Sequence, residues 1–394
     1  MAKPAGSKSF NVGDFADFVH QFGEEIDDAI TELGRMNLIL FGMSGVGKST
    51  LINAVCNRKV AKVGIGKPVT SKVTYHEHPD GYLGLWDTVG FELGDEGEEI
   101  LADVSQIVRE RQEGPIKDQI HAVWYCVRAS DRRFEKHHER IVQRLSCLGL
   151  PVILVLTQVG KDVDGNIDPD AYALARYIES RKLRLAPDDR AILTNARVSF
   201  GGLVVHGLQE LVEATFRVLP DVAHDAFVAA QRIDLPGKRE AARRSEQLGI
   251  IAIGAAVVVP IPLGDAAAIV PIQVAMIARI SAIYGLPIAK SRLAHIATSA
   301  LLSQGVSYVA KSAVRSLLRF IPGVNIAVTA LQVAVATSLT YAVAEAWIQL
   351  CEYLHDKDAE DVAAFVDSDE MRTMFLAAFK SNAANSPPRH LTGS

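Results

Sequence analysis

A short glycine-rich stretch has the residue types and spacing of a phosphate-binding loop. Residues 42–49, GMSGVGKS, are a glycine, four unrestricted positions and then Gly-Lys-Ser. The apolar run 37–41 before it predicts a buried strand, and residues 50–56 after it have a helical pattern. Glycines let backbone N–H groups face a phosphate chain, and a helix N-terminus adds its positive dipole end. We therefore predict nucleotide contacts from Gly42, Ser44, Gly45, Val46, Gly47, Lys48, Ser49 and Thr50.

A second motif, Asp-x-x-Gly, closes the apolar run 83–86. Asp87 can hold Mg²⁺ through water, and the Gly90 N–H can donate to a γ-phosphate. Between the motifs, Thr70 is the candidate for a threonine that touches Mg²⁺ only when the γ-phosphate is present, and Thr74 is the alternative. Both threonines could instead simply favour the strand that follows. The predicted metal ligands are Ser49, Thr70 and Asp87, and the predicted catalytic residues are Lys48, Thr70 and Gly90.

Strands and helices alternate around these motifs. The sequence predicts strands at 37–41, 73–78, 83–86, 121–126, 152–156 and 192–198. It predicts helices near 48–56, 98–112, 134–148, 169–182 and 205–218. Such alternation indicates an α/β P-loop NTPase fold, a mostly parallel sheet with helices on both faces that binds ligands at the carboxyl ends of its strands. An all-α apolar domain is expected to follow it.

The chain resembles TRAFAC-class, Era-like GTPases, close to bacterial relatives of the immunity-related GTPases. The resemblance spans roughly residues 35–220 and is carried by 42–49, 68–70, 86–90 and 121–126. It implies a Mg²⁺-dependent protein that binds GTP and GDP, hydrolyses GTP to GDP and phosphate with slow intrinsic turnover, and acts as a nucleotide-controlled switch.

The base-recognition motif departs from that family, which reads guanine with Asn/Thr-Lys-x-Asp. Thr157 fits the pattern, but Gln158 replaces the lysine and Gly160 stands where the aspartate belongs. Asp162 could serve only if the loop is remodelled. Base contacts are expected from Thr157, Gln158 and, by backbone, Ser199. Strict guanine choice is thus implied by the resemblance alone, and a relaxed base preference is an alternative.

The residue that would position the attacking water also departs from the Ras pattern. Phe91 follows Gly90 where Ras-like proteins have a glutamine, and a phenylalanine cannot orient water. Another group must act, such as a backbone group, K⁺ or a partner in trans. Arg132 or Arg133 could supply a trans arginine across a homodimer of the G domain, although such arginines are more often solvated surface residues.

The last third of the chain changes composition. Residues 248–264, 266–278 and 320–344 carry no charge. The segments 260–265, 271–273, 276–277 and 283–285 resemble the YcjF-type helical domain of unknown function over roughly 240–350. The run 320–344 is long enough to span a bilayer. Two interpretations stay open, an alanine-rich soluble bundle and a membrane-associated domain whose basic residues meet anionic lipid: Arg239, Arg243, Arg244, Lys311, Arg315 and Arg319.

Composition bounds the remaining possibilities. The 394 residues carry a net charge of -5, which gives no sign of nucleic-acid binding. Four scattered cysteines indicate a reducing compartment, so we expect a cytoplasmic protein, with the inner face of the cell membrane as an alternative. His76, His78 and the pair 137–138 are interpreted as surface histidines.

The predicted organisation has five parts. They are an N-terminal amphipathic helix packed on the helical region (1–34), the G domain (35–220), a helical linker (221–246), the apolar helical domain (247–356) and a C-terminal helix with a disordered tail (357–394). A dynamin-like membrane scaffold, in which nucleotide controls self-assembly, is the alternative function.

Overall fold

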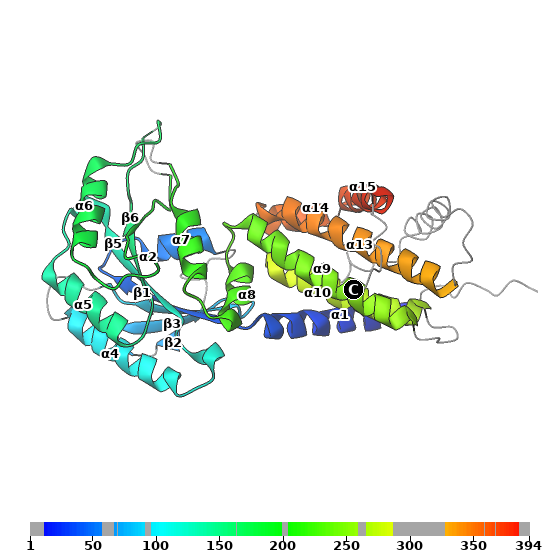
Figure 1. The fold of residues 1–394 in the computed structure, drawn as a ribbon, viewed down its shortest axis with the longest axis horizontal. Helices are drawn as coiled ribbons and strands as arrows, with labels where there is room; N and C mark the ends of the chain where they lie inside the picture. The colour runs from blue at the N-terminus through cyan, green and yellow to red at the C-terminus, as the bar shows by residue number, and fades with distance from the viewer. Residues whose placement is uncertain are drawn as a thin grey trace, which may run out of the picture. The chain divides into compact units, whose positions relative to one another are not determined.

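The computed structural model describes residues 12–56, 67–68, 70–90, 96–162, 164–198, 204–258, 265–286, 328–357, 359–366 and 368–385. The chain divides into two compact units. The sheet unit is Glu32–Gly237, and the helical unit combines Met1–Thr31 with Lys238–Ser394 (Figure 1). The domain boundaries drawn from the sequence remain predictions.

The sheet unit contains a seven-stranded sheet in the order β2-β3-β4-β1-β5-β6-β7. β1 pairs in parallel with β4 and β5, and β6 pairs in parallel with β5 and β7. Only β3 runs antiparallel to its neighbours β2 and β4. The predicted P-loop NTPase fold with a mostly parallel sheet is confirmed. The strands are β1 (Met36–Gly42), β2 (Lys67–Pro68), β3 (Val73–Glu77), β4 (Leu83–Thr88), β5 (Ala122–Arg128), β6 (Val152–Thr157) and β7 (Ile192–Leu193).

Helices cover both faces of this sheet (Figure 1). Alternate residues of the strands, such as Ile39 and Tyr125, share one apolar core with side chains of α4, α5 and α6. The other face meets α2, α7 and α8, and there Trp124 Nε1 donates to Thr215 Oγ1 of α7 at 3.1 Å. The helices are α2 (Lys48–Val55), α4 (Glu96–Gln112), α5 (Lys136–Cys147), α6 (Pro169–Ser180), α7 (Leu208–Phe216) and α8 (Asp221–Ala230).

One predicted strand, 192–198, is much shorter than expected. β7 ends at Leu193, because Asn195 instead bridges antiparallel to His206 and its side-chain amide donates to the carbonyls of Arg197 and Val204. These contacts turn the chain into a loop directly after the strand. The two-residue β2 was not predicted from the sequence.

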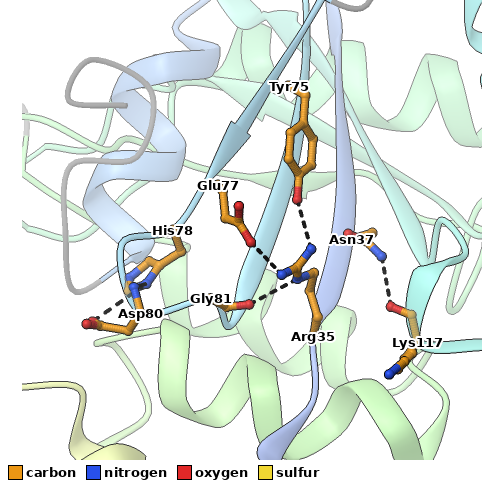
Figure 2. Close-up of polar contacts among 8 residues, drawn as sticks. All are labelled: Arg35, Asn37, Tyr75, Glu77, His78, Asp80, Gly81 and Lys117. Atoms are coloured by element: carbon orange, nitrogen blue, oxygen red, sulfur yellow. Dashed lines mark hydrogen bonds and ion pairs between the residues drawn. The ribbon is translucent and has the colours of Figure 1, made fainter. Parts of the chain in front are cut away.

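A polar cluster holds the end of β1 that lies away from the glycine-rich loop (Figure 2). The Arg35 guanidinium donates to Tyr75 Oη at 3.2 Å and to the Gly81 carbonyl at 3.2 Å, and it forms an ion pair with Glu77. The Asn37 amide nitrogen donates to the carbonyl of Lys117 at 3.1 Å. The cluster therefore fixes the turn between β3 and β4 to the start of β1.

The helical unit packs around α13 (Val328–His355), which contacts α10 (Asp265–Tyr284) and α15 (Asp369–Asn385). Polar bonds cross its apolar interior: Trp347 Nε1 donates to Ser281 Oγ at 3.0 Å, and Gln273 Nε2 donates to Thr340 Oγ1 at 3.0 Å. The remaining helices are α1 (Val12–Leu33), α9 (Leu235–Val258) and α14 (Ala359–Val366).

Two arginines proposed for lipid binding are engaged inside the helical unit. Arg243 Nε donates to Glu345 at 3.1 Å, and Arg239 pairs with Glu345 at 3.6 Å and with Glu352 at 3.2 Å. Arg244 pairs with Glu240 at 3.5 Å. The three other basic residues of that proposal, and residues 320–327 of the long apolar run, lie outside the described residues. No described helix has both the length and the apolar character needed to cross a membrane.

Candidate nucleotide-binding site

The glycine-rich loop follows β1 and ends where α2 begins. Gly42 has φ +150°, and a Cβ there would lie 2.4 Å from the carbonyl oxygen of Cys126 on β5, so only glycine lets the two strands approach this closely. Gly47 at φ +96° is in the left-handed region directly before the first turn of α2. The loop therefore has the backbone form that its sequence pattern predicts, and it opens onto a helix N-terminus.

Lys48 turns its ammonium group back into this loop. Its side chain is buried, and Nζ donates to the carbonyls of Gly42 at 2.7 Å and Met43 at 3.2 Å. Burial lowers the pKa of Lys48, while the nearby Asp87 and Cys126 act in the opposite direction. These carbonyl contacts hold a cation inside the loop, close to where a bound phosphate chain would lie.

Asp87 reaches the same place from the neighbouring strand, since β4 pairs with β1 and Asp87 lies beside Leu40. Its Oδ1 atom is buried and accepts no hydrogen bond. Burial raises the pKa of Asp87, and the charges of Lys48 and His76 partly offset that rise. Ser49 lies in the first turn of α2. An unpartnered carboxylate oxygen and a serine hydroxyl are the hard oxygen donors that suit Mg²⁺.

Gly90 lies against the loop itself. A Cβ on Gly90 would come within 2.4 Å of the Cα of Ser44. The segment after β4 therefore touches the glycine-rich loop, and a larger residue at this position would push the two apart. Phe91, two residues beyond Val89, lies outside the described residues.

The two candidate threonines have different surroundings. The Thr70 hydroxyl accepts the backbone N–H groups of Lys72 at 3.1 Å and Val73 at 3.0 Å, so it stabilises the turn before β3. Thr74 lies directly opposite Asp87 in the β3–β4 register. In this conformation the alternative threonine is the one next to the aspartate.

A cavity of about 460 Å³ opens on the other side of the loop. The Thr157 hydroxyl ties β6 to the loop by donating to the Val46 carbonyl at 2.6 Å, and Gln158 Nε2 donates to the Gly45 carbonyl at 3.2 Å. The cavity is lined by Gly47, Thr50, Leu51, Ser130, Thr157, Gln158, Thr194, Asn195, Ala196 and Arg197. Thr157 and Gln158 thus lie beside the loop as the sequence pattern requires.

The loop after β7 enters this cavity earlier than predicted. Residues 194–197 line it, whereas Val198 is exposed and Ser199 lies outside the described residues. Sequence analysis missed 194–197 because it extended the strand through them. The polar pair Thr194-Asn195 directly after an apolar dipeptide was the available signal.

The described residues that line the cavity include no acidic side chain. The Asp162 carboxylate is used within its own loop, where it accepts the backbone N–H of Asn166 at 2.7 Å and its side-chain amide at 3.0 Å. These hydrogen bonds lower the pKa of Asp162. The loop remodelling that would bring Asp162 to a base is absent from this conformation.

The arginine pair lies after β5. Arg132 forms an ion pair with Asp170 of α6. Arg133 lines a cavity of about 310 Å³ that also contacts Met43 and Val46 of the glycine-rich loop. Arg133 is therefore the arginine of the pair that borders the loop from its own chain.

Two histidines interpreted as surface residues are buried. His138 on α5 makes a 2.7 Å hydrogen bond with Tyr125 Oη, and burial lowers the pKa of His138 to about 3. His78 is also buried. His138 lies on the same helical stripe as Ile141, Val142 and Leu145, and this spacing was the signal that the neighbouring charged residues obscured.

Comparison with known proteins places these features in a class. Residues 37–158 match the family model described as 50S ribosome-binding GTPase, and residues 227–368 match a domain of unknown function, DUF697. The chain thus joins a P-loop GTPase domain to a largely helical C-terminal region. It is 33% identical over 138 residues to Magnetosome membrane protein 22 of Magnetospirillum gryphiswaldense. The matched segment covers 34% of this chain and 67% of that protein. The chain belongs to the same family as that protein.

Solved structures of GTP-binding proteins are also similar. A probable GTP-binding protein engB is 19% identical over 46% of this chain and 97% of its own, with a TM-score of 0.34. The G domain of the T. maritima FeoB iron transporter is 19% identical over 47% of this chain and 98% of its own, with a TM-score of 0.30. Toc33 from Arabidopsis thaliana, in complex with Mg²⁺ and GMPPNP, is 17% identical over 54% of this chain and 95% of its own, with a TM-score of 0.32.

Proposed function

We propose that the sheet unit binds GTP and GDP with Mg²⁺, hydrolyses GTP slowly, and acts as a switch coupled to the helical unit. The observation that carries this proposal is the meeting of Lys48 and Asp87 at the carboxyl ends of two paired parallel strands, around a glycine-rich loop. A cation, a carboxylate and a glycine-rich loop that opens onto a helix N-terminus at one sheet edge suit a triphosphate and its metal.

Each residue has a distinct proposed role. The N–H groups of residues 42–50 surround the phosphates, and Lys48 exchanges its carbonyl contacts for the β- and γ-phosphate oxygens. Ser49 and Asp87 hold Mg²⁺, the ion that neutralises charge on the phosphates when it is bound. Gly90, close to the loop, donates its N–H to the γ-phosphate. Thr70 approaches the metal only after its turn before β3 opens, and Thr74 is the alternative.

The switch proposal follows from how these segments are held. Thr70 and Gly90 flank the open end of the β3–β4 hairpin, so a γ-phosphate that draws either one inward would pull on that end of the hairpin. We make three finer proposals of the same kind. The chain belongs to the Era-like or immunity-related subclass, its hydrolysis of GTP rises on dimerisation, and Arg133 is donated across a homodimer.

Nucleotide binding by Lys48→Ala tests the proposal. We expect calorimetry with Mg²⁺ and GDP to show binding for the unaltered protein and at least about a hundredfold weaker binding for the variant, because a charged phosphate contact is lost. Lys72→Ala is the matched control, because the Lys72 ammonium pairs with Glu99 on α4 and not with a group of the loop. Retained affinity in Lys48→Ala would refute the phosphate site.

Relaxed base choice is a second candidate, favoured because none of the described residues in the cavity lining is acidic. A site that does not pair with the guanine edge rejects other bases weakly. Competition of ATP against a fluorescent GDP measures it. A preference for guanine below about a hundredfold supports relaxed choice, and one of about 10⁴ or more excludes it.

Association with an anionic membrane, and a dynamin-like assembly on it, are alternatives supported by two observations. The relative is named a membrane protein, and α9 exposes Leu248 and Ile251. Flotation with vesicles containing anionic lipid, with and without a non-hydrolysable GTP analogue, separates them. Nucleotide-dependent flotation with visible assemblies supports the scaffold, and no flotation supports a switch that acts away from membranes.

A further inference from the structure

His76 shares a face of the sheet with Asp87. In the antiparallel β3–β4 pair, Thr74 lies opposite Asp87 and His76 lies opposite Leu85. Side chains alternate along a strand, so His76 and Asp87 point to the same side as diagonal neighbours. Diagonal positions are roughly 7–8 Å apart, and an imidazole and a carboxylate that extend from them can be joined by one water molecule.

Both side chains carry a buried polar atom that lacks a hydrogen bond. These atoms are His76 Nδ1 and Asp87 Oδ1. Buried polar groups in native proteins are nearly always satisfied by a protein group, a water or an ion. The two atoms are complementary, because an imidazole N–H donates and a carboxylate oxygen accepts. Lys48, a cationic side chain near Asp87, already donates to the carbonyls of Gly42 and Met43.

We infer that His76 is a positioning residue for Asp87, holding its carboxylate through one bridging water so that it faces the Mg²⁺ of a bound nucleotide. The inference rests on the proposed function. Carboxylates that serve a metal are themselves oriented by hydrogen bonds from an outer shell, and loss of such a partner costs about 10–100-fold in metal affinity. A carboxylate oxygen has two lone pairs, so Oδ1 can accept from this side and still face the metal.

The test compares His76→Leu with His76→Asn by Mg²⁺ titration of the GDP complex, read out by the rate of nucleotide release. The leucine variant should bind Mg²⁺ about 10–100-fold more weakly, while its GDP affinity in EDTA stays within about twofold. The asparagine variant should retain Mg²⁺ affinity within about threefold, because its amide nitrogen lies near the position of Nδ1. Tyr75→Phe is the control, since that side chain is on the opposite face of β3.

Four results would overturn the inference. Unchanged Mg²⁺ affinity in His76→Leu would mean that the imidazole does not orient Asp87. An equal loss of affinity with Mg²⁺ and in EDTA, or no rescue by asparagine, would show a merely structural role. If the unaltered protein does not bind Mg²⁺ and GDP, both this inference and the proposed function are wrong. If it binds them and only the variants behave differently from expectation, the inference alone fails.

Discussion

The buried position of the Asp87 carboxylate lowers the stability of the folded protein at neutral pH. The carboxylate is buried beside the glycine-rich loop, and burial raises its pKa above the usual aspartate value. A raised folded-state pKa means that the ionised form is disfavoured by folding. The stability that depends on a protonated Asp87 carboxyl is fully present below the ordinary pKa of an aspartate. It is lost as the pH rises through the pKa that Asp87 has in the folded protein. Keeping an ionised carboxylate at this place therefore lowers the stability of the folded protein, and in the proposed function that carboxylate holds Mg²⁺.

We predict that Asp87→Asn stabilises the nucleotide-free protein at neutral pH. The amide keeps the shape but removes the buried charge, so the unfolding temperature should rise by a few degrees. The gain should shrink as the pH falls through the folded-state pKa and vanish below about pH 3, where the carboxyl is protonated in both states. Differential scanning fluorimetry across this pH range measures it. The exposed Asp164→Asn is the control, and a lower unfolding temperature for Asp87→Asn at pH 7 would contradict the account.

At the scale of elements, the β3–β4 hairpin joins the candidate site to the far end of the sheet. One end of the hairpin carries Thr70, Asp87 and Gly90. At the other end, Arg35 binds three groups of β3 and the turn, and the Met36 N–H donates to the Tyr82 carbonyl at 2.9 Å. Because Arg35 directly precedes β1, these contacts tie the turn of the hairpin to the start of that strand.

We predict that Arg35→Ala loosens the turn more than the site. Loss of the guanidinium contacts should cost about 1–2 kcal/mol of unfolding free energy. Amide hydrogen exchange should quicken at Met36, His78 and Gly81, whose N–H groups are bonded across this turn. Arg35→Lys should recover only part of the loss, since an ammonium cannot bind three acceptors in a fixed fork. Unchanged exchange at these amides would show that the cluster is not needed to hold the turn.

The sequence predicted the elements of the sheet well, because each buried strand is a nearly continuous apolar run between turn residues. The glycine-rich loop was predicted with its neighbours because its pattern is local. The end of β7 was not predicted, since Ile192–Leu193 and the following residues look equally strand-like in the sequence. Only the long-range bridge between Asn195 and His206 shows where the strand ends. The placement of Thr74 opposite Asp87 was likewise hidden, because it depends on the register of two strands rather than on a motif.

At the scale of the whole molecule, the helical unit is largely apolar, but ion pairs connect its helices α9 and α13. Glu345 on α13 is buried and forms ion pairs with two arginines of α9, and Lys238 Nζ donates to the Ile283 carbonyl at 2.8 Å. Buried ion pairs add little net stability, but they penalise every other arrangement of the helices. The uncharged run 320–344 is thus followed by Glu345, whose ion pairs favour one arrangement of α9 and α13.

We predict that Glu345→Gln weakens the helical unit and, through the proposed coupling, changes nucleotide preference. Removing the carboxylate should cost about 1–3 kcal/mol, since Arg239 and Arg243 lose their shared partner while staying partly solvated. Because coupling between sites is reciprocal, a helical unit that responds to the nucleotide must in turn alter the ratio of GTP-analogue to GDP affinity, here by at least about twofold.

Urea unfolding and paired nucleotide titrations measure the two effects separately. Glu240→Gln is the matched control, because Glu240 is a largely exposed partner of Arg244 on the same helix and its removal should cost at most about 0.5 kcal/mol. A Glu345→Gln protein that is destabilised but keeps the affinity ratio of the unaltered chain would show that the two units are energetically independent. The proposed switch would then have to act through the sheet unit alone.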